Sequence, residues 1–209
     1  MARTEPFDKH RDRYENWFEM NKYAYQSELN AVKELLPETG EGMEIGVGSG
    51  LFAGPLGIRH GVEPSEKMRE LALKRGVKAV NGIGESLPYN DARFDYALMV
   101  TTICFLDDVA ASLKEAYRVL RPEGFLIIGF VDRQSVLGKY YLEHKDKSLF
   151  YGPAVFYSTD DVLRFLRDAG FGDFDFRQTI FHLLKDIHEV EPVKKGYGEG
   201  SFVVVRGNK

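Results

Sequence analysis

The segment that most constrains the fold of this chain is residues 44–50, Glu-Ile-Gly-Val-Gly-Ser-Gly, in which a short apolar run ends in three alternating glycines. The apolar run predicts a buried strand. The glycines predict a tight turn after it, because glycine adopts left-handed backbone angles without strain and lets a ligand approach the main chain closely. The chain therefore favours an α/β domain that binds a nucleotide-like ligand at this turn.

The glycine spacing separates this turn from two other nucleotide loops. A dinucleotide fingerprint, Gly-x-Gly-x-x-Gly, would need a glycine at position 51, where the chain has Leu51. A phosphate-binding loop would need a lysine after Gly50, and none follows. What remains, Glu-x-Gly-x-Gly-x-Gly, resembles motif I of the class I S-adenosylmethionine-dependent methyltransferases. The alternative is a glycine turn in an ordinary α/β domain.

Residues 58–65, Ile-Arg-His-Gly-Val-Glu-Pro-Ser, predict a second strand that ends in Glu63, followed by Pro64 and a helix-capping serine. An acid in this place can accept hydrogen bonds from both ribose hydroxyls of a nucleoside. Glu63 lies 13 residues after Gly50, closer than the usual spacing of about 20, so the first crossover must be short and its helix truncated. The alternative for Glu63 is a solvated acid at a strand end.

Four more segments resemble the same family in the same order. Residues 81–89 resemble the segment that lies along the adenine, except that Ile83 stands where the family carries an acid for the adenine amino group. The base would then be held by backbone groups around Ile83 and Gly84. Residues 94–108 resemble the fourth motif, and residues 113–129 the helix, turn and fifth strand that follow.

The N-terminal residues 14–18, Tyr-Glu-Asn-Trp-Phe, resemble the segment that caps the cofactor in small-molecule members of the family. The resemblance thus covers about residues 11–132. It is closest to the ubiquinone/menaquinone-biosynthesis-like group, methyltransferase type 11.

This resemblance implies S-adenosylmethionine as the cofactor, with S-adenosylhomocysteine as the product and no metal. Glu44 would orient the aminoacid portion of the cofactor, the backbones of Gly46 and Gly48 would pass beneath it, and Thr101 would lie near the transferred methyl. The cofactor-binding residues that we expect are Tyr14, Glu44, Gly46, Gly48, Gly50, Glu63, Pro64, Ile83, Gly84, Glu85 and Thr101.

Composition limits which kinds of acceptor and which cell compartment we expect. The net charge of −4 offers no attraction to a polyphosphate backbone, which argues against nucleic acid as a partner. The chain has no run of 18 apolar residues, and residues 1–6 lack the apolar core of a signal peptide, so we expect a cytoplasmic enzyme that does not enter a membrane. The single Cys104 excludes an internal disulfide. Either a monomer or a homodimer is compatible with the sequence.

The expected fold is α/β, a Rossmann-like doubly wound sheet of seven mainly parallel strands with an antiparallel last strand and a small helical lid. Strands are expected near 43–47, 58–62, 77–80, 94–100, 124–131, 172–181 and 201–206, and helices near 11–36, 65–75, 107–120 and 158–169. The whole chain, 1–209, forms one domain in this prediction. Its parts are an N-terminal cap about 7–36, a cofactor-binding core about 41–132, a lid insertion about 133–157, and a C-terminal helix and strand pair about 158–209.

The lid insertion is rich in Tyr, Lys and Phe and should lie above the carboxyl ends of the strands, together with residues 7–25 and 182–200. We expect its aromatic side chains to enclose a water-excluding chamber with those of the N-terminal cap. The members are Tyr14, Trp17, Phe18, Tyr140, Tyr141, Phe150, Tyr151, Phe156 and Tyr157. The residues expected to contact the acceptor are Trp17, Phe18, Thr102, Tyr140, Tyr157 and Tyr197. The alternative is that most of the aromatic residues only pack the lid down.

Transfer from a sulfonium needs alignment and exclusion of water rather than a metal or a covalent nucleophile. A general base is useful only for a protonated acceptor, and the candidates are Asp132, Tyr14 and His144. Asp132 is best placed, at the end of the fifth strand, although an ion pair with Arg133 is an equally good explanation.

We therefore predict an S-adenosylmethionine-dependent methyltransferase that acts by in-line displacement on an unidentified small molecule. Two alternatives remain open. One is an enzyme that needs a protein substrate or partner, with the lysine-rich segments 139–147 and 185–197 as its surface. The other is a chain that binds the cofactor without turnover.

Overall fold

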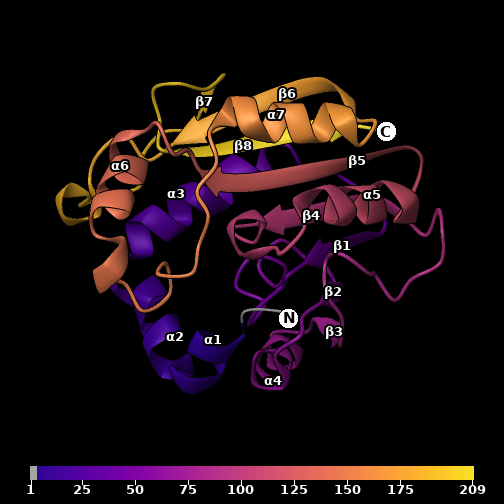
Figure 1. Ribbon diagram of the computed structural model, residues 1–209, viewed down its shortest axis with the longest axis horizontal. Coiled ribbons are helices and arrows are strands. Elements are labelled where there is room, and N and C mark those ends of the chain that lie inside the picture. The colour runs from indigo at the N-terminus through magenta and orange to yellow at the C-terminus, as the bar shows by residue number, and fades with distance from the viewer. Residues whose placement is uncertain (1–3) are drawn as a thin grey trace.

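The computed structural model describes residues 4–209 (Figure 1). Met1–Arg3, part of the stretch that argued against a signal peptide, lie outside the described residues. One eight-stranded sheet runs through the molecule. Its strands are β1 (Gly42–Ile45), β2 (His60–Val62), β3 (Lys78–Val80), β4 (Phe94–Val100), β5 (Leu120–Val131), β6 (Gly172–Thr179), β7 (Lys194–Lys195) and β8 (Phe202–Asn208).

Seven α-helices are described, and the longest has 12 residues. They are α1 (Glu5–Lys9), α2 (Arg11–Met20), α3 (Lys22–Lys33), α4 (Glu66–Lys74), α5 (Val109–Val119), α6 (Val136–Glu143) and α7 (Thr159–Asp168). Within residues 4–209, none of these helices has the length and apolar character needed to cross a membrane.

The strand order β3-β2-β1-β4-β5-β8-β6-β7 places the chain's first strand inside the sheet. Strands β1 to β5 pair in parallel, while β8 runs antiparallel to both β5 and β6. The order reverses at β1, whose two neighbours are β2 and β4. In open α/β sheets a crevice forms at the carboxyl ends of the strands at such a reversal, so the topology itself marks a binding site there.

The prediction of a mainly parallel sheet with an antiparallel last strand is confirmed, but the count of seven strands is wrong. The additional strand is the two-residue β7, which pairs with β6 at the sheet edge through Lys194 and Lys195. Both residues are exposed and neither lies in an apolar run, so hydrophobic alternation gave no signal for this strand.

The single long helix expected over 11–36 is also divided. Asn21 ends α2 and precedes α3, and both its backbone N–H and its side-chain amide donate to the Trp17 carbonyl. A side chain that competes in this way for a helix carbonyl favours a break. The short α1 before it was not expected.

Helices cover both faces of the sheet. In Figure 1, α5 and α7 lie in front of the sheet and α3 lies behind it. One core cluster joins α5 and α7 to the strands through Leu113, Ala116 and Leu166, all fully buried. The other joins α3 to the opposite face through Ala31 and Val32. The strands are therefore shielded on both faces, and ligand access is left to their carboxyl ends.

The crossover from β1 to β2 is short, as the spacing predicted, but it contains turns and no helix between residues 49 and 57, where a truncated helix was expected. The expected helix signals elsewhere are confirmed. Ser65 caps α4 by accepting from the Met68 N–H, and Ser158 forms a capping box with Asp161 at the start of α7. Gly170, at φ +101°, follows the end of α7.

Candidate functional site

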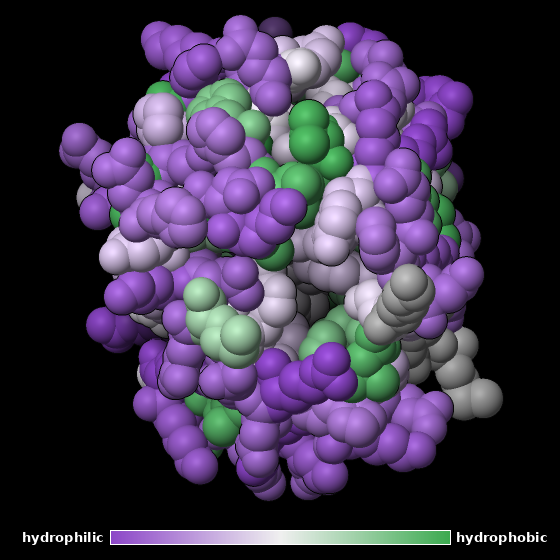
Figure 2. All heavy atoms as spheres, turned by 90° about the vertical axis from the view of Figure 1, so that its left-hand side faces the viewer, coloured by the Kyte–Doolittle hydropathy of each residue, from purple (hydrophilic) through white to green (hydrophobic). Residues whose placement is uncertain are grey.

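A cavity of about 260 Å³ opens where β1, β2, β4 and β5 end. Figure 2 shows the face that carries these ends, with a narrow hollow near its centre bordered by hydrophobic residues. The wall combines the turn after β1, the residues after β2 and β4, and aromatic residues from both the N-terminal cap and the lid insertion. Segments far apart in the sequence thus converge on one enclosed space.

The turn after β1 has the conformation that its glycines predicted. Gly46 and Gly48 have φ values of +68° and +53°. A Cβ on Gly46 would fall 2.3 Å from Cγ2 of Thr102, too close for any side chain. The Thr102 hydroxyl donates to the Gly46 carbonyl at 3.1 Å, which joins this turn to the end of β4. Glycine is needed here for both angle and space.

Gly50 has a different part in the turn. It has φ +81°, and its added Cβ would lie 3.2 Å from Cα of Ala72 in α4. Gly50 does not line the cavity in the described structure. Gly50 therefore allows the turn to pack closely against α4.

Glu44 and Glu63 are both buried and both line the cavity. One Glu44 oxygen accepts from the Ala53 N–H at 2.9 Å, which folds the short crossover back over β1. Burial raises the pKa of Glu44 well above its usual range, and the nearby Glu63 carboxylate adds to the shift. This end of the site is acidic and screened from water.

The two Glu63 oxygens accept from the backbone N–H groups of Gly48 at 3.0 Å and Ser65 at 2.8 Å. Burial raises the pKa of Glu63, while these two hydrogen bonds oppose the shift. Arg69 donates to the carbonyls of Glu63 and Pro64 and so holds the end of β2 in place. The carboxylate is therefore fixed beside the glycine turn.

Residues 82–85 form the wall next to Glu63. Ile83 is partly exposed, and a Cβ on Gly84 would fall 2.5 Å from the Ser112 hydroxyl oxygen, so the chain passes tightly over α5 here. Glu85 accepts from the N–H groups of Asp107 at 2.9 Å and Asp108 at 3.2 Å. Its carboxylate fastens this segment to the start of α5.

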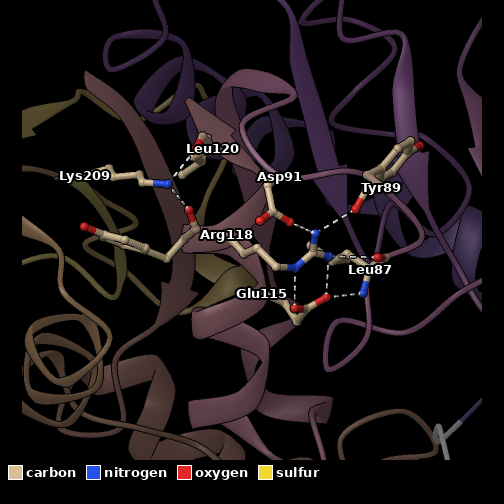
Figure 3. A network of polar contacts seen from close by, with 8 residues as sticks. Leu87, Tyr89, Asp91, Glu115, Arg118, Leu120 and Lys209 are labelled. Atoms are coloured by element: carbon tan, nitrogen blue, oxygen red, sulfur yellow. Dashed lines mark hydrogen bonds and ion pairs between the residues drawn. The ribbon is translucent and has the colours of Figure 1, made fainter. Parts of the chain in front are cut away.

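Arg118 fastens the next residues of the same segment to α5 (Figure 3). Its guanidinium donates to the carbonyls of Leu87 and Tyr89 and to the carboxylates of Asp91 and Glu115. Glu115 in turn accepts from the Leu87 N–H at 2.8 Å. The network lies outside the cavity and holds one of its walls.

Thr101, directly after β4, has a φ of +50°, which is strained for a threonine. Its N–H donates to the Gly129 carbonyl at 2.8 Å, which keeps it next to β5. Both Thr101 and Thr102 line the cavity. Strain of this kind in a residue at a cavity is typical of functional sites.

Aromatic residues close the cavity on the side away from the sheet. Tyr14, Trp17 and Phe18 come from α2, while Tyr141, Phe150 and Tyr151 come from the lid insertion. Tyr14 and Phe150 meet with ring centroids 5.8 Å apart, and Tyr141 and Tyr151 with centroids 4.7 Å apart. Burial raises the pKa of Tyr14, so its phenol keeps its proton. These six belong to the aromatic set expected from the sequence.

Phe7 was not expected in this wall. Its ring lies 5.6 Å from those of Tyr14 and Phe150 and 5.4 Å from that of Phe105, another residue missed. The adjacent Asp8 accepts from the Ser65 hydroxyl, which ties α1 to the start of α4. The sequence signal was weak, since Phe7 stands in a five-residue helix with no apolar periodicity.

Several expected site residues lie outside the cavity. Tyr140 is exposed and stacks on His144, with ring centroids 4.2 Å apart. Tyr197 is exposed and packs on Phe176 at 4.7 Å. Tyr157 packs against Phe165 at 5.4 Å, behind the main cavity. These side chains contact their own local surface rather than the chamber.

Asp132 is buried, and its carboxylate accepts hydrogen bonds from backbone groups around it. It accepts from the Gln134 N–H at 2.6 Å and the Thr159 N–H at 2.9 Å, and also from the Thr159 hydroxyl. Arg133 pairs with Asp161 rather than with Asp132. Asp132 therefore joins β5 to the start of α7 and does not reach the cavity.

Glu28 lines the cavity and was missed by the sequence analysis. It lies on α3 and is only 5% exposed. A signal was present, because Ala24, Glu28 and Val32 share one helical face at a spacing of four, and the other two residues are apolar. In the described part of the chain no group of His, Cys, Asp and Glu is arranged to hold a metal ion.

Fold and cavity together define a class of protein. The sheet order reverses at β1, the glycine turn after β1 has no room for a side chain at Gly46, and a fixed acid follows β2, an arrangement that fits an adenosyl ligand. This is the class of the Rossmann-like S-adenosylmethionine-dependent methyltransferases, and S-adenosylmethionine is its cofactor.

Comparison with known proteins identifies the family. A profile described as a methyltransferase domain matches residues 43–128. A crystal structure from Thermotoga maritima, named "SAM-dependent methyltransferase, possible histamine N-methyltransferase", is 54% identical, with a TM-score of 0.96 over 99% of each chain. An uncharacterized protein of Methanocaldococcus jannaschii is 44% identical over 97% of this chain and 98% of its own. The chain belongs to the S-adenosylmethionine-dependent methyltransferases of the methyltransferase-domain family.

A more distant relative supports the expected subgroup. The ubiquinone/menaquinone biosynthesis C-methyltransferase of Rickettsia prowazekii is 27% identical over 131 residues, which cover 54% of this chain and 53% of that protein. The resemblance to this group expected from the motifs is therefore confirmed.

Proposed function

We propose that this methyltransferase acts on a small-molecule acceptor held in the aromatic chamber. The observation that carries the proposal is the cavity of about 260 Å³ beneath the aromatic residues, a volume just below the roughly 300–1,000 Å³ of typical ligand pockets. Its outer wall is formed by the aromatic residues of α1, α2 and the lid insertion, which favours a small acceptor over a polymer. The Thermotoga relative is named as a possible histamine N-methyltransferase, and histamine is a small amine.

In this proposal Glu63 binds the ribose hydroxyls, and the segment with Ile83 and Gly84 lies along the adenine. The turn at Gly46 and Gly48 passes beneath the aminoacid portion. Glu44, Pro64, Glu85 and Thr101 complete that side of the cavity, and Tyr14 covers it. Gly50 supports the turn from behind.

When bound, the sulfonium supplies an electrophilic methyl group with a good leaving group. The residues of this chain have to align the acceptor and exclude water. Tyr14 and Tyr151 keep their phenolic protons because burial raises the pKa of each, so they can donate hydrogen bonds to the acceptor rather than remove its proton. Phe7, Phe18 and Phe150 exclude solvent.

The first test is isothermal titration of S-adenosylmethionine and S-adenosylhomocysteine, with NADH as the control ligand. Micromolar binding of the two adenosyl ligands and no binding of NADH would support the cofactor site. Turnover is then measured with a panel of small amines, including histamine, and of thiols, phenols and quinol precursors. Methylation seen only with protein fractions of a cell extract would contradict a small-molecule acceptor, and binding without turnover on either panel would contradict catalysis.

A further inference from the structure

Glu28 is a buried carboxyl for which the proposed cofactor site has no use. It lies on α3, lines the cavity and is 5% exposed. In residues 4–209 no cation forms an ion pair with it and no hydrogen-bond donor reaches its carboxylate. Burial raises the pKa of Glu28 to about 8. A buried carboxyl without partners lowers stability, so the fold alone gives no reason for its presence.

The position of Glu28 is fixed by its neighbours on α3. The Ser27 hydroxyl accepts from the Glu191 N–H at 2.8 Å, and the Tyr25 hydroxyl donates to the Leu51 carbonyl beside the glycine turn. Both contacts join α3 to segments that are distant in sequence. The carboxyl therefore enters the cavity from a rigid element, as a recognition group should.

The surroundings of Glu28 suit a cation. Tyr141 and Tyr151 lie next to each other, and the charge of Glu28 acts on both. Trp17 and Phe18 line the same cavity. Aromatic faces attract cationic groups, most strongly when water is excluded. One carboxyl among aromatic rings is thus a site for a protonated or hydrogen-bonding amine.

The other buried acids of the cavity already have donors. Glu44 accepts from Ala53, and Glu63 accepts from Gly48 and Ser65. Glu63 also follows β2, whereas α3 packs against β5, β6 and β8. Since β1 and β4 stand between β2 and β5 in the sheet, Glu28 lies toward the opposite side of the cavity from the ribose acid.

On the basis of the proposed function, we propose that the acceptor is a small amine and that Glu28 binds the amino group that is methylated. The carboxylate accepts a hydrogen bond from the amine N–H. As the N–CH₃ bond forms, the S–CH₃ bond breaks and leaves a neutral thioether. An amine that binds in its protonated form first gives a proton to the Glu28 carboxylate, which frees the nitrogen lone pair for the attack. The product leaves as the methylated ammonium ion, and Glu28 releases its proton to solvent.

The test compares Glu28→Gln with wild type and with a control variant, Glu19→Gln. Glu19 is an exposed residue of α2, so the control makes the same change of charge away from the cavity. Isothermal titration into protein saturated with S-adenosylhomocysteine uses amines paired with alcohols of the same skeleton, from ethylamine and ethanol to 2-phenylethylamine and 2-phenylethanol. We expect wild type and Glu19→Gln to bind the best amine about 10- to 100-fold more tightly than its alcohol. Glu28→Gln should lose this preference and keep its affinity for S-adenosylhomocysteine.

Initial rates provide the second readout. For any amine that wild type methylates, Glu28→Gln should lower kcat/KM by about 100-fold or more, because glutamine cannot take the proton. The inference is wrong if no amine binds wild type better than its matched alcohol, or if Glu28→Gln keeps the preference. Failure of S-adenosylhomocysteine to bind wild type would instead overturn the proposed function, so the two failures are distinguishable.

Discussion

The Glu63 carboxylate accepts a hydrogen bond from the N–H of Gly48 at 3.0 Å, so the acid at the end of β2 is joined directly to the glycine turn after β1. The two residues were singled out separately in the sequence, one as a ribose acid and one as a backbone cradle. Their contact means that the two parts of the proposed cofactor site share one hydrogen bond. A change in either residue therefore affects the other.

The first prediction concerns Glu63→Ala, which removes this acceptor and the proposed ribose contact. We expect affinity for S-adenosylhomocysteine to fall by about 1.5–3 kcal/mol, the usual contribution of a hydrogen bond to a charged group. Isothermal titration measures the change, with Glu70→Ala on the exposed side of α4 as the control. Unchanged binding by the Glu63→Ala variant would show that the ribose acid has been misassigned.

The second prediction separates two costs of replacing a glycine, the steric clash of the new side chain and the strain of a positive φ. Gly46 and Gly57 both have positive φ, +68° and +75°, but only Gly46 has Thr102 where its Cβ would stand. Gly57→Ala should cost about 1 kcal/mol of stability through the angle alone, while Gly46→Ala should cost clearly more and abolish cofactor binding. Thermal unfolding and titration measure both effects.

A double variant completes this test. Thr102→Ala removes the methyl group that a Cβ on residue 46 would strike, so Gly46→Ala combined with Thr102→Ala should recover part of the lost stability. Equal damage from Gly46→Ala and Gly57→Ala would argue that the close approach to Thr102 is unimportant.

The third prediction assigns Asp132 to stability rather than to catalysis. Asp132→Asn replaces one of the carboxylate oxygens that accept from Gln134 and Thr159 with a donor. We expect the free energy of unfolding to fall by about 1–3 kcal/mol while kcat stays within a few-fold of wild type. The neighbouring exposed Asp160→Asn is the matched control and should cost less than about 1 kcal/mol. A stable Asp132→Asn variant with no turnover would instead favour Asp132 as the base.

The fourth prediction concerns the pH dependence of stability. Burial raises the pKa of Glu28 to about 8 in the folded protein, above its value in the unfolded chain. The folded state therefore holds an extra proton between about pH 4.5 and 8, and Glu28 lowers stability progressively as pH rises through that range, by at most about 1.4 kcal/mol per pH unit.

Glu28→Gln removes this ionisation, so the variant should gain stability over wild type as pH rises and differ little below about pH 4.5. Urea unfolding at pH 5, 6.5 and 8.5 measures the difference. The contributions of buried Glu44 and Glu63 to the pH dependence cancel in this difference, because both proteins retain them. Glu19→Gln should follow the wild-type curve. A pH-independent difference would mean that Glu28 is not buried without a partner.

The fifth prediction uses the network of Figure 3. Arg118→Lys keeps the positive charge but loses the fork that reaches Leu87, Tyr89, Asp91 and Glu115 together. We expect a loss of roughly 1–3 kcal/mol in unfolding free energy and weaker binding of S-adenosylhomocysteine, because the wall proposed to lie along the adenine loosens. Arg164→Lys, an exposed residue with one surface ion pair, should change stability by less than about 0.5 kcal/mol.

The sequence by itself determined the class of fold, the family and the cofactor. These depend on short local patterns, namely an apolar run before the glycines at 46, 48 and 50, an acid after the next strand, and caps such as Ser65 and Ser158. Each pattern acts within a few residues of the chain, so it can be recognised without knowing what packs against it. The edge strand β7 and the helix break at Asn21 were not predicted. The first is defined only by its backbone pairing with β6, and the second only by the hydrogen bonds of Asn21 to the Trp17 carbonyl.

Only the tertiary structure decided which polar and aromatic side chains face the cavity. Asp132 stands at the end of a strand that borders the cavity, yet its carboxylate turns to Thr159, 27 residues away. Glu28 lies 18 residues before Gly46, the first glycine of the turn, yet the packing of α3 against the sheet brings it inside. The direction of a side chain depends on contacts between distant segments, and burial without a partner is a property of the folded chain. The proposed acceptor site could therefore be recognised only in the folded structure.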